Sequence, residues 1–184
     1  MVKRTGLAKT LYLKLLSQPV QDRQVYRQIE KLQAKSVVEL GVGTCQRSQR
    51  IIASQLRYHS LSEIRYTGID LFEARQTDEQ RLTLKQAHRL LAESGAKVRL
   101  IPGDPYSALA RSANALTGTD LIVIDASQAT AELAPTWFYI PRMLHDRSVV
   151  LLAIATDEGR FRRVAPAEVA DLAQAAAQAK KRAA

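Results

Sequence analysis

Apolar residues along the chain follow two different spacings. Short apolar runs, typical of buried strands, alternate with longer stretches in which apolar residues recur every three or four positions, as on one face of a helix. The short runs predict five strands, at residues 37–40, 65–69, 97–101, 121–124 and 148–154. The longer stretches predict helices between them, at residues 47–58, 78–94, 104–116 and 129–144. Strands joined by helical crossovers form a parallel sheet with helices on both faces, so we expect an α/β fold.

Both ends of the chain are also predicted to be helical. An amphipathic stretch around Leu15 stops at Pro19, and Val25 and Ile29 recur at helical spacing in a second stretch. The alanine-rich tail over residues 166–184 predicts a last helix. The two N-terminal helices are expected either to cover a face of the sheet or to close a site at its edge, and the sequence favours neither.

The length and composition fit one domain. With 184 residues, 46% of them hydrophobic, the chain is long enough for one sizeable core. We expect a single domain over residues 1–184, with N-terminal helices (1–34), a sheet core (35–155) and a tail helix (156–184). No apolar run approaches the roughly 20 residues that a membrane span requires, and no signal-like segment follows the N-terminus. We therefore expect a cytoplasmic protein without a membrane partner.

The net charge of +9 is large for a chain of this size. Basic residues lie at both ends of the chain and at helical positions such as Arg47, Arg50 and Arg57. We interpret most of them as solvated surface. The charge is compatible with a nucleic-acid partner without favouring one, and an oligomer is equally compatible with the sequence.

A glycine loop follows the first predicted strand. Gly41 and Gly43 permit a backbone turn that a side chain would block, and a helix begins directly afterwards. The dinucleotide-binding pattern G-x-G-x-x-G requires a third glycine where this chain has Gln46. Glu39, two residues before the loop, would repel a pyrophosphate. The loop therefore disfavours a nicotinamide or flavin cofactor and suits a cationic ligand better.

Acidic residues stand at or just beyond the ends of four predicted strands. In an open parallel sheet, ligands bind beyond the carboxyl ends of the strands, so these side chains are expected to share one edge. The four residues are Glu39, Asp70, Asp104 and Asp125. An acid in this position has a second interpretation, because it can simply cap the next helix, as we consider for Asp70 and Asp104.

The loop and the strand ends resemble a known family. The stretch from Glu39 to Cys45 is similar to the first motif E/D-x-G-x-G-x-G of the class I S-adenosylmethionine-dependent methyltransferases, with Cys45 at the last glycine. The stretch from Gly103 to Asp125 resembles the pattern G-D-(x)n-D-L-I-x-I-D of the small O-methyltransferase branch. The resemblance covers residues 36–154, about two thirds of the chain, and implies a Rossmann-like sheet.

The resemblance also implies a cofactor and the residues that bind it. S-adenosylmethionine is the implied cofactor, and Asp125 is the candidate base for an acceptor hydroxyl. The implied cofactor-binding residues are Glu39, Gly41, Gly43 and Thr44 at the methionine end, Asp70 at the ribose hydroxyls, and Leu71, Gly103 and Asp104 at the adenine.

The chain departs from the family pattern in two places. In the metal-dependent members the fourth strand is followed by further acidic or histidine ligands, whereas Asp125 is followed here by Ala126, Ser127 and Gln128. We therefore expect no metal. Only 29 residues follow Ala155, so the sheet is expected to lack most of the usual C-terminal hairpin.

Two functions stay open. The first is methyl transfer from S-adenosylmethionine to an oxygen or nitrogen of an unidentified acceptor. The second is a vestigial methyltransferase-like module that binds the cofactor or a partner without catalysis, which the short C-terminus and Cys45 in the loop favour. Cys45 itself is expected to be a small packing residue rather than a nucleophile, and Trp137 a core residue rather than a stacking platform.

Overall fold

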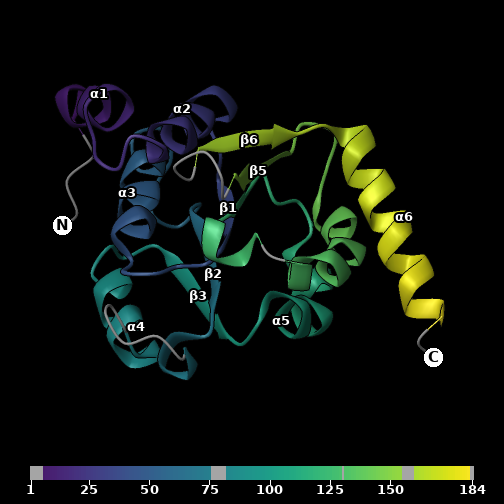
Figure 1. Ribbon diagram of the computed structural model, residues 1–184. Helices are drawn as coiled ribbons and strands as arrows, with labels where there is room; N and C mark the ends of the chain where they lie inside the picture. Colours follow the sequence, from purple (N-terminus) through teal and green to yellow (C-terminus); the bar gives the residue numbers. More distant parts are fainter. Residues whose placement is uncertain (1–5, 76–81, 130, 155–159, 183–184) are drawn as a thin grey trace.

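A six-stranded sheet lies at the centre of the computed structural model, which describes residues 6–75, 82–129, 131–154 and 160–182 (Figure 1). The strands are β1 (Ser36–Leu40), β2 (Arg65–Asp70), β3 (Lys97–Pro102), β4 (Leu121–Ile124), β5 (Val149–Ala153) and β6 (Phe161–Val164). Their order is β3-β2-β1-β4-β5-β6. All neighbours run parallel except β6, which is antiparallel to β5. The predicted α/β fold with five parallel strands is confirmed.

The two central strands explain why the sequence pattern was clear. Every residue of β1 and β4 is buried, and strands covered on both faces appear as unbroken apolar runs. Ser36 and Glu39 are the two polar residues of β1, and both are buried. From β1 the chain extends the sheet through β2 to β3, and it then crosses to the other side of β1 to form β4 and β5. The carboxyl edge between β1 and β4 is therefore the point at which the strand order reverses.

Helices cover both faces of the sheet (Figure 1). One side carries α1 (Leu7–Leu15), α2 (Asp22–Leu32), α3 (Gln46–Gln55) and α4 (Leu84–Ala92). The other side carries α5 (Pro105–Ser112), α6 (Pro166–Arg182) and the 3-10 segments η2 (Ala113–Leu116), η4 (Ala131–Phe138) and η5 (Ile140–Met143). Two shorter 3-10 turns, η1 (Phe72–Ala74) and η3 (Ala126–Gln128), follow β2 and β4. Side chains of β1 alternate between the two cores, with Val37 on the α3 side and Val38 on the α5 side.

Two predicted helices differ from the structure. The helix predicted at residues 78–94 begins only at Leu84, because Thr83 caps it and exchanges hydrogen bonds with Gln86 in a capping box. Residues 78–81 lie outside the described part of the chain. Within the helix predicted at residues 129–144, the structure has η4 and η5 in place of an α-helix, since Pro135 and Pro141 remove backbone donors that an α-helix requires. Residue 130 lies outside the described part of the chain.

The sixth strand, β6, is not predicted by the sequence pattern. It is four residues long and lies at the edge of the sheet, with Arg163 exposed between the buried Phe161 and Val164. A short, charged edge strand lacks the apolar run that marks the central strands. The sequence did not lead us to expect this antiparallel strand, whereas α6, which follows it, is the predicted tail helix.

The N-terminal helices pack on α3 in a stack. Helix α2 contacts α3, and α1 contacts α2. Val25 and Ile29 of α2 are fully buried, whereas Leu11 and Leu16 are more than half exposed, so the first amphipathic stretch leaves its apolar side uncovered. No helix among the described residues is long and apolar enough to cross a membrane. Trp137 is buried in the core on the α5 side, as expected.

Candidate functional site

The candidate site lies at the carboxyl edge of the sheet, where the loops after β1, β2 and β4 meet. Two cavities occur there. One of about 230 Å³ lies against the glycine loop and is bounded by Asp22, Gly43, Thr44, Arg75 and Asp125, among others. The other, of about 420 Å³, lies beyond β2 and β4 between Leu71 and Asp104 on one side and Ser127 and Gln128 on the other. Most of the residues that the sequence predicts for a ligand border one of these two spaces, whereas Glu39, Asp70 and Gly103 line neither.

Glu39 is buried beneath α3. Because side chains alternate along a strand, Glu39 points to the same face as Val37, towards the first turn of α3. Its carboxylate is fully buried and accepts hydrogen bonds from Arg47 Nε at 2.6 Å and Ser48 Oγ at 2.7 Å, and from the Tyr66 hydroxyl. Burial raises the pKa of Glu39, while Arg47 and the two hydroxyls oppose the rise. Glu39 therefore does not line either cavity, and its influence on a ligand is through Arg47.

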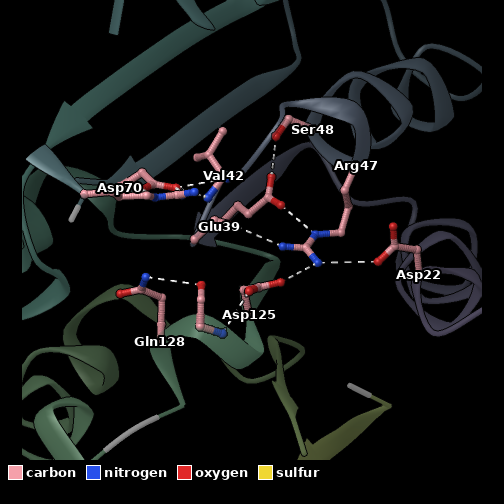
Figure 2. Close-up of polar contacts among 12 residues, drawn as sticks. Asp22, Glu39, Val42, Arg47, Ser48, Asp70, Asp125 and Gln128 are labelled. Carbon is pink, nitrogen blue, oxygen red and sulfur yellow. Dashed lines mark hydrogen bonds and ion pairs between the residues drawn. The ribbon is translucent and has the colours of Figure 1, made fainter. Parts of the chain in front are cut away.

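Arg47 links three carboxylates from three parts of the chain (Figure 2). Besides Glu39 it contacts Asp125 at 2.8 Å and Asp22 at 3.4 Å, and its Nη2 donates to the Gly41 carbonyl at 2.9 Å. Only 12% of its side chain is exposed, which contradicts the interpretation of Arg47 as solvated surface. Burial alone would lower the pKa of Arg47, but the surrounding carboxylates raise it, so the guanidinium stays charged.

Asp70 holds the glycine loop in place. Its Oδ2 accepts hydrogen bonds from the backbone N–H groups of Val42 at 2.6 Å and Gly43 at 3.0 Å (Figure 2). Its Oδ1 accepts from the Phe72 N–H at 3.3 Å, and the Arg75 guanidinium pairs with both oxygens. The side chain is 1% exposed. In this conformation Asp70 organises the loop, and a ribose would have to replace Arg75 as its partner.

The two glycines of the loop are needed for different reasons. Both have positive φ, +90° at Gly41 and +58° at Gly43. A Cβ at Gly41 would lie 2.7 Å from the Asp125 Cβ, so the loops after β1 and β4 can meet only if this residue is glycine. A Cβ at Gly43 would meet nothing within 4 Å. Gly43 and the exposed Thr44 are therefore the part of the loop that faces open space.

Cys45 occupies the last glycine position of the motif. It has a φ of +63° at the N-cap position of α3, where its side chain makes no capping hydrogen bond, so a side chain stands where the left-handed backbone favours glycine. The thiol is buried, and burial raises its pKa to about 12. A thiol that stays protonated at neutral pH is a poor nucleophile, which supports the packing role.

Leu71, Gly103 and Asp104 are brought together beyond β2 and β3. Leu71 is 36% exposed beside the larger cavity, and Gly103 adopts a φ of +128° while its N–H donates to the Asp70 carbonyl at 2.9 Å. Asp104 Oδ1 accepts from the Ser107 N–H at 2.9 Å and caps α5, as the second interpretation of this residue predicts. Capping occupies one carboxylate oxygen of Asp104, on the side of α5.

Asp125 follows β4 and also has partners on both oxygens. Oδ1 accepts from the Ser127 N–H at 2.9 Å and caps η3, and Oδ2 pairs with Arg47. Burial would raise the pKa of Asp125, but Arg47 and the Ser127 N–H hold it below its ordinary value. The carboxylate is thus ionised at neutral pH, as a base must be, and only weakly basic.

Sequence reasoning missed three contributors to this site: Arg47, Arg75 and Asp22. Arg47 joins nearby Glu39 to the distant Asp22 and Asp125, and Arg75 pairs with Asp70 five residues earlier, and none of these spacings is a recognised motif. Their positions in the sequence could have indicated a role in the site: Arg47 stands one turn after the glycine loop, and Arg75 follows Asp70 at the end of η1. Among the described residues no group of three or more His, Cys, Asp or Glu side chains is placed to hold a metal ion.

Comparison with solved structures identifies the fold. The chain matches the O-methyltransferase TomG from Streptomyces achromogenes, a structure in complex with S-adenosylmethionine, with a TM-score of 0.54 and 17% identity over 97% of this chain and 79% of that one. It matches an O-methyltransferase from Bacillus cereus, in complex with S-adenosylhomocysteine, with a TM-score of 0.55 and 17% identity over 85% of this chain and 69% of that one. No protein-family model and no curated protein matches the sequence. At this identity the comparison establishes a shared fold: the chain has the α/β sheet architecture of S-adenosylmethionine-dependent O-methyltransferases.

Proposed function

We propose that this protein binds S-adenosylmethionine at the carboxyl edge of the sheet and transfers its methyl group to an oxygen or nitrogen of an acceptor. The observation that carries the proposal is the pair of cavities at the point where the strand order reverses, one against the glycine loop and one against Leu71 and Asp104. The solved structures with the same fold include complexes with this cofactor or its demethylated product.

The residues around the two cavities fit such a cofactor. The site contains four carboxyl groups, those of Asp22, Glu39, Asp70 and Asp125, and two guanidiniums, those of Arg47 and Arg75, so acidic groups outnumber basic ones. An excess of carboxylates favours a ligand that carries a sulfonium and an ammonium. The open backbone at Gly43 and Thr44 would hold the methionine end, Asp70 the ribose, and Leu71 with Asp104 the adenine.

The protein's own part in the reaction is to position the acceptor. When bound, S-adenosylmethionine supplies an activated methyl group: the acceptor atom bonds to the methyl carbon while the carbon–sulfur bond breaks and its electron pair stays on sulfur. The chain must align the acceptor with that bond, and it must provide an outlet for a hydroxyl proton. Asp125 is the ionised carboxylate at the edge between β1 and β4, and we propose that it accepts this proton once it has separated from Arg47.

The ligand is tested by isothermal titration with S-adenosylmethionine, S-adenosylhomocysteine and NADH. Asp70→Ala should weaken binding of the adenosyl compounds by about 1–3 kcal/mol, because charge-assisted hydrogen bonds to the ribose would be lost. Asp120→Ala is a matched control. Asp120 also accepts two backbone N–H bonds, from Lys35 and Ser36 at 2.9 Å, but at the opposite edge of the sheet. Binding of NADH alone would contradict the proposal, and equal affinity in the two variants would leave Asp70 with a structural role only.

Methyl transfer should not depend on a metal ion. Ser127 and Gln128 stand where metal-dependent relatives of the fold have further charged ligands, and a hydroxyl and an amide bind hard divalent cations weakly. We expect the conversion of S-adenosylmethionine to S-adenosylhomocysteine to be unchanged after treatment with EDTA. A loss of activity that magnesium restores would contradict this prediction.

A second candidate function, cofactor binding without catalysis, is favoured by the contacts of Arg47. Arg47 neutralises Glu39 and occupies one oxygen of the only proposed base, Asp125. The two candidates differ in turnover. A protein that binds S-adenosylmethionine tightly, and forms no S-adenosylhomocysteine with any acceptor offered, would support the binding module.

A further inference from the structure

Helix α1 presents an apolar stripe to solvent. Leu7, Leu11 and Leu15 are spaced by four residues, so they lie along one face of the helix, and they are 75%, 54% and 46% exposed. Leu13 lies on the other side of the helix, where it is buried in the core on the α3 side. Just beyond the helix, Leu16 and Val20 are also more than half exposed. We call the five exposed side chains the α1 surface: Leu7, Leu11, Leu15, Leu16 and Val20.

Exposed apolar side chains are concentrated at this place. In the part of the chain that the structure describes, every exposed large hydrophobic side chain except Leu71 lies between Leu7 and Val20. Helix α1 is the outermost element of the stack that it forms with α2 and α3, on the side of the molecule opposite to α6 (Figure 1). A contiguous apolar surface on the outside of a domain indicates a contact with a partner or with a membrane.

Two arginines of α2 lie beside this surface. Arg23 Nε donates a hydrogen bond to the Ser17 carbonyl at 2.8 Å, and Arg27 Nη2 donates one to the Lys14 carbonyl at 3.1 Å. Both guanidiniums are thereby held against the end of α1. Among the described residues, neither of them forms an ion pair with a carboxylate. Each keeps further donors for an anionic group, because a guanidinium carries five N–H groups.

The acids of α2 do not neutralise these arginines. Asp22 is buried and contacts Arg47 at the glycine loop. Glu30 forms an ion pair with Lys14. The exposed apolar stripe is therefore bordered by positive charge, and its complement is a partner that combines an apolar region with anionic groups.

We propose that the α1 surface binds the surface of a membrane that contains anionic phospholipids. The leucines would enter the boundary between headgroups and acyl chains, and Arg23 and Arg27 would meet the lipid phosphates. A second copy of the chain is a poorer complement, because a two-fold contact would place the same arginines against each other in a chain of net charge +9. A nucleic acid offers phosphates but no apolar region for the leucine stripe.

The proposal corrects the scope of the sequence-based expectation of no membrane partner, which considered only segments long enough to span a bilayer. It does not rest on the proposed function, because lipid binding can be measured without a cofactor. Pro19, between Leu16 and Val20, also borders the cavity against the glycine loop, so the α1 surface adjoins the candidate site.

Cosedimentation with lipid vesicles tests the partner. The protein should bind saturably to vesicles made of equal parts phosphatidylcholine and phosphatidylglycerol, and much less to vesicles of phosphatidylcholine alone. Added salt should weaken the binding, because it screens the attraction between the arginines and the phosphates. Equal binding to both kinds of vesicle, or binding to neither, would overturn the proposal. A dimer that Leu11→Ser dissociates, seen by sedimentation velocity together with an absence of vesicle binding, would assign the surface to a second copy.

Two matched pairs of variants locate the contact. Leu11→Ser should lower the affinity for the mixed vesicles severalfold, whereas Leu71→Ser, at the other exposed leucine, should not. Arg23→Gln combined with Arg27→Gln should lower the affinity about fivefold for each arginine, since a basic residue at an anionic surface contributes about 1 kcal/mol. Lys181→Gln combined with Arg182→Gln removes the same charge from the end of α6 and should have little effect. Equal affinity within either pair would overturn the proposal.

A fluorescent label reports directly which face meets the lipid. Cys45 is the single cysteine of the chain and is buried, so a thiol-reactive dye should label an introduced surface cysteine. An environment-sensitive dye on Leu11→Cys should shift to the blue when mixed vesicles are added, and the same dye on Gln178→Cys of α6 should not. Circular dichroism checks that all variants keep the parent fold. An equal shift at both positions, or no shift at position 11, would contradict binding through the α1 surface.

Discussion

Arg47→Met should destabilise the protein by about 3–5 kcal/mol, as expected when one partner of a buried ion pair is removed. The loss arises because Glu39 is fully buried and would keep only the hydroxyls of Ser48 and Tyr66 as partners. Asp22 and Asp125 would lose the same guanidinium. Urea unfolding followed by circular dichroism measures the change as a shift of the midpoint at constant slope.

The destabilisation should depend on pH. Burial already raises the pKa of Glu39 above its ordinary value of 4.5, and removal of Arg47 would raise it further. A carboxyl whose folded pKa lies above its unfolded pKa contributes stability that is fully present below the unfolded pKa and is lost as the pH rises through the folded pKa. The difference between the variant and the parent should therefore be smallest near pH 4.5 and largest near pH 7.

The double variant Glu39→Gln with Arg47→Met is the control for this pair. Removing both charges should recover part of the loss, because no uncompensated charge then stays at position 39. Arg47→Lys keeps the charge and loses the planar fork that reaches three carboxylates, so it should fall between the parent and Arg47→Met. A double variant as unstable as the sum of the single variants would show that Glu39 and Arg47 are not coupled.

The sequence predicts the centre of the sheet well because β1 and β4 are covered on both faces. The apolar runs of β1 and β4 are too short for a buried helix, so they indicate strands. Asp104 and Pro105 mark the start of α5, because they are favourable N-cap and N1 residues. The local pattern does not predict β6, because this strand is short and lies at the edge of the sheet. It also does not predict the 3-10 form of residues 131–143, because two prolines interrupt a stretch whose apolar residues otherwise have helical spacing.

The sequence predicts where the candidate site lies in the fold, but it does not predict the contacts that the site residues make. Strand ends placed Glu39, Asp70, Asp104 and Asp125 at one edge, because parallel strands share a direction. The sequence indicated helix capping for Asp104, and the structure confirms it. It could not show that Glu39, Asp70 and Asp125 are already paired with arginines. Such contacts depend on residues from distant parts of the chain, as with Asp22 and Arg47. The acids therefore have structural roles whether or not a cofactor binds.

Gly41→Ala should cost about 2–5 kcal/mol of stability, combining about 1–2 kcal/mol for a side chain at positive φ with about 1–3 kcal/mol for overpacking. The crowding is specific, because the new Cβ would lie 2.7 Å from the Cβ of Asp125 and 3.1 Å from side-chain atoms of Ser127 and Gln128. Gly43→Ala is the matched control.

Gly43 also has a positive φ, but a Cβ added there would meet open space. Its substitution should therefore lower stability only by the cost of a side chain at positive φ, about 1–2 kcal/mol. The difference between the two variants in urea unfolding therefore measures the contact between the loops after β1 and β4, free of the shared cost of positive φ. If the two substitutions reduced stability equally, the loops would have room to separate. The positive φ of Gly41, and not its close packing against Asp125, would then explain why glycine is needed at this position.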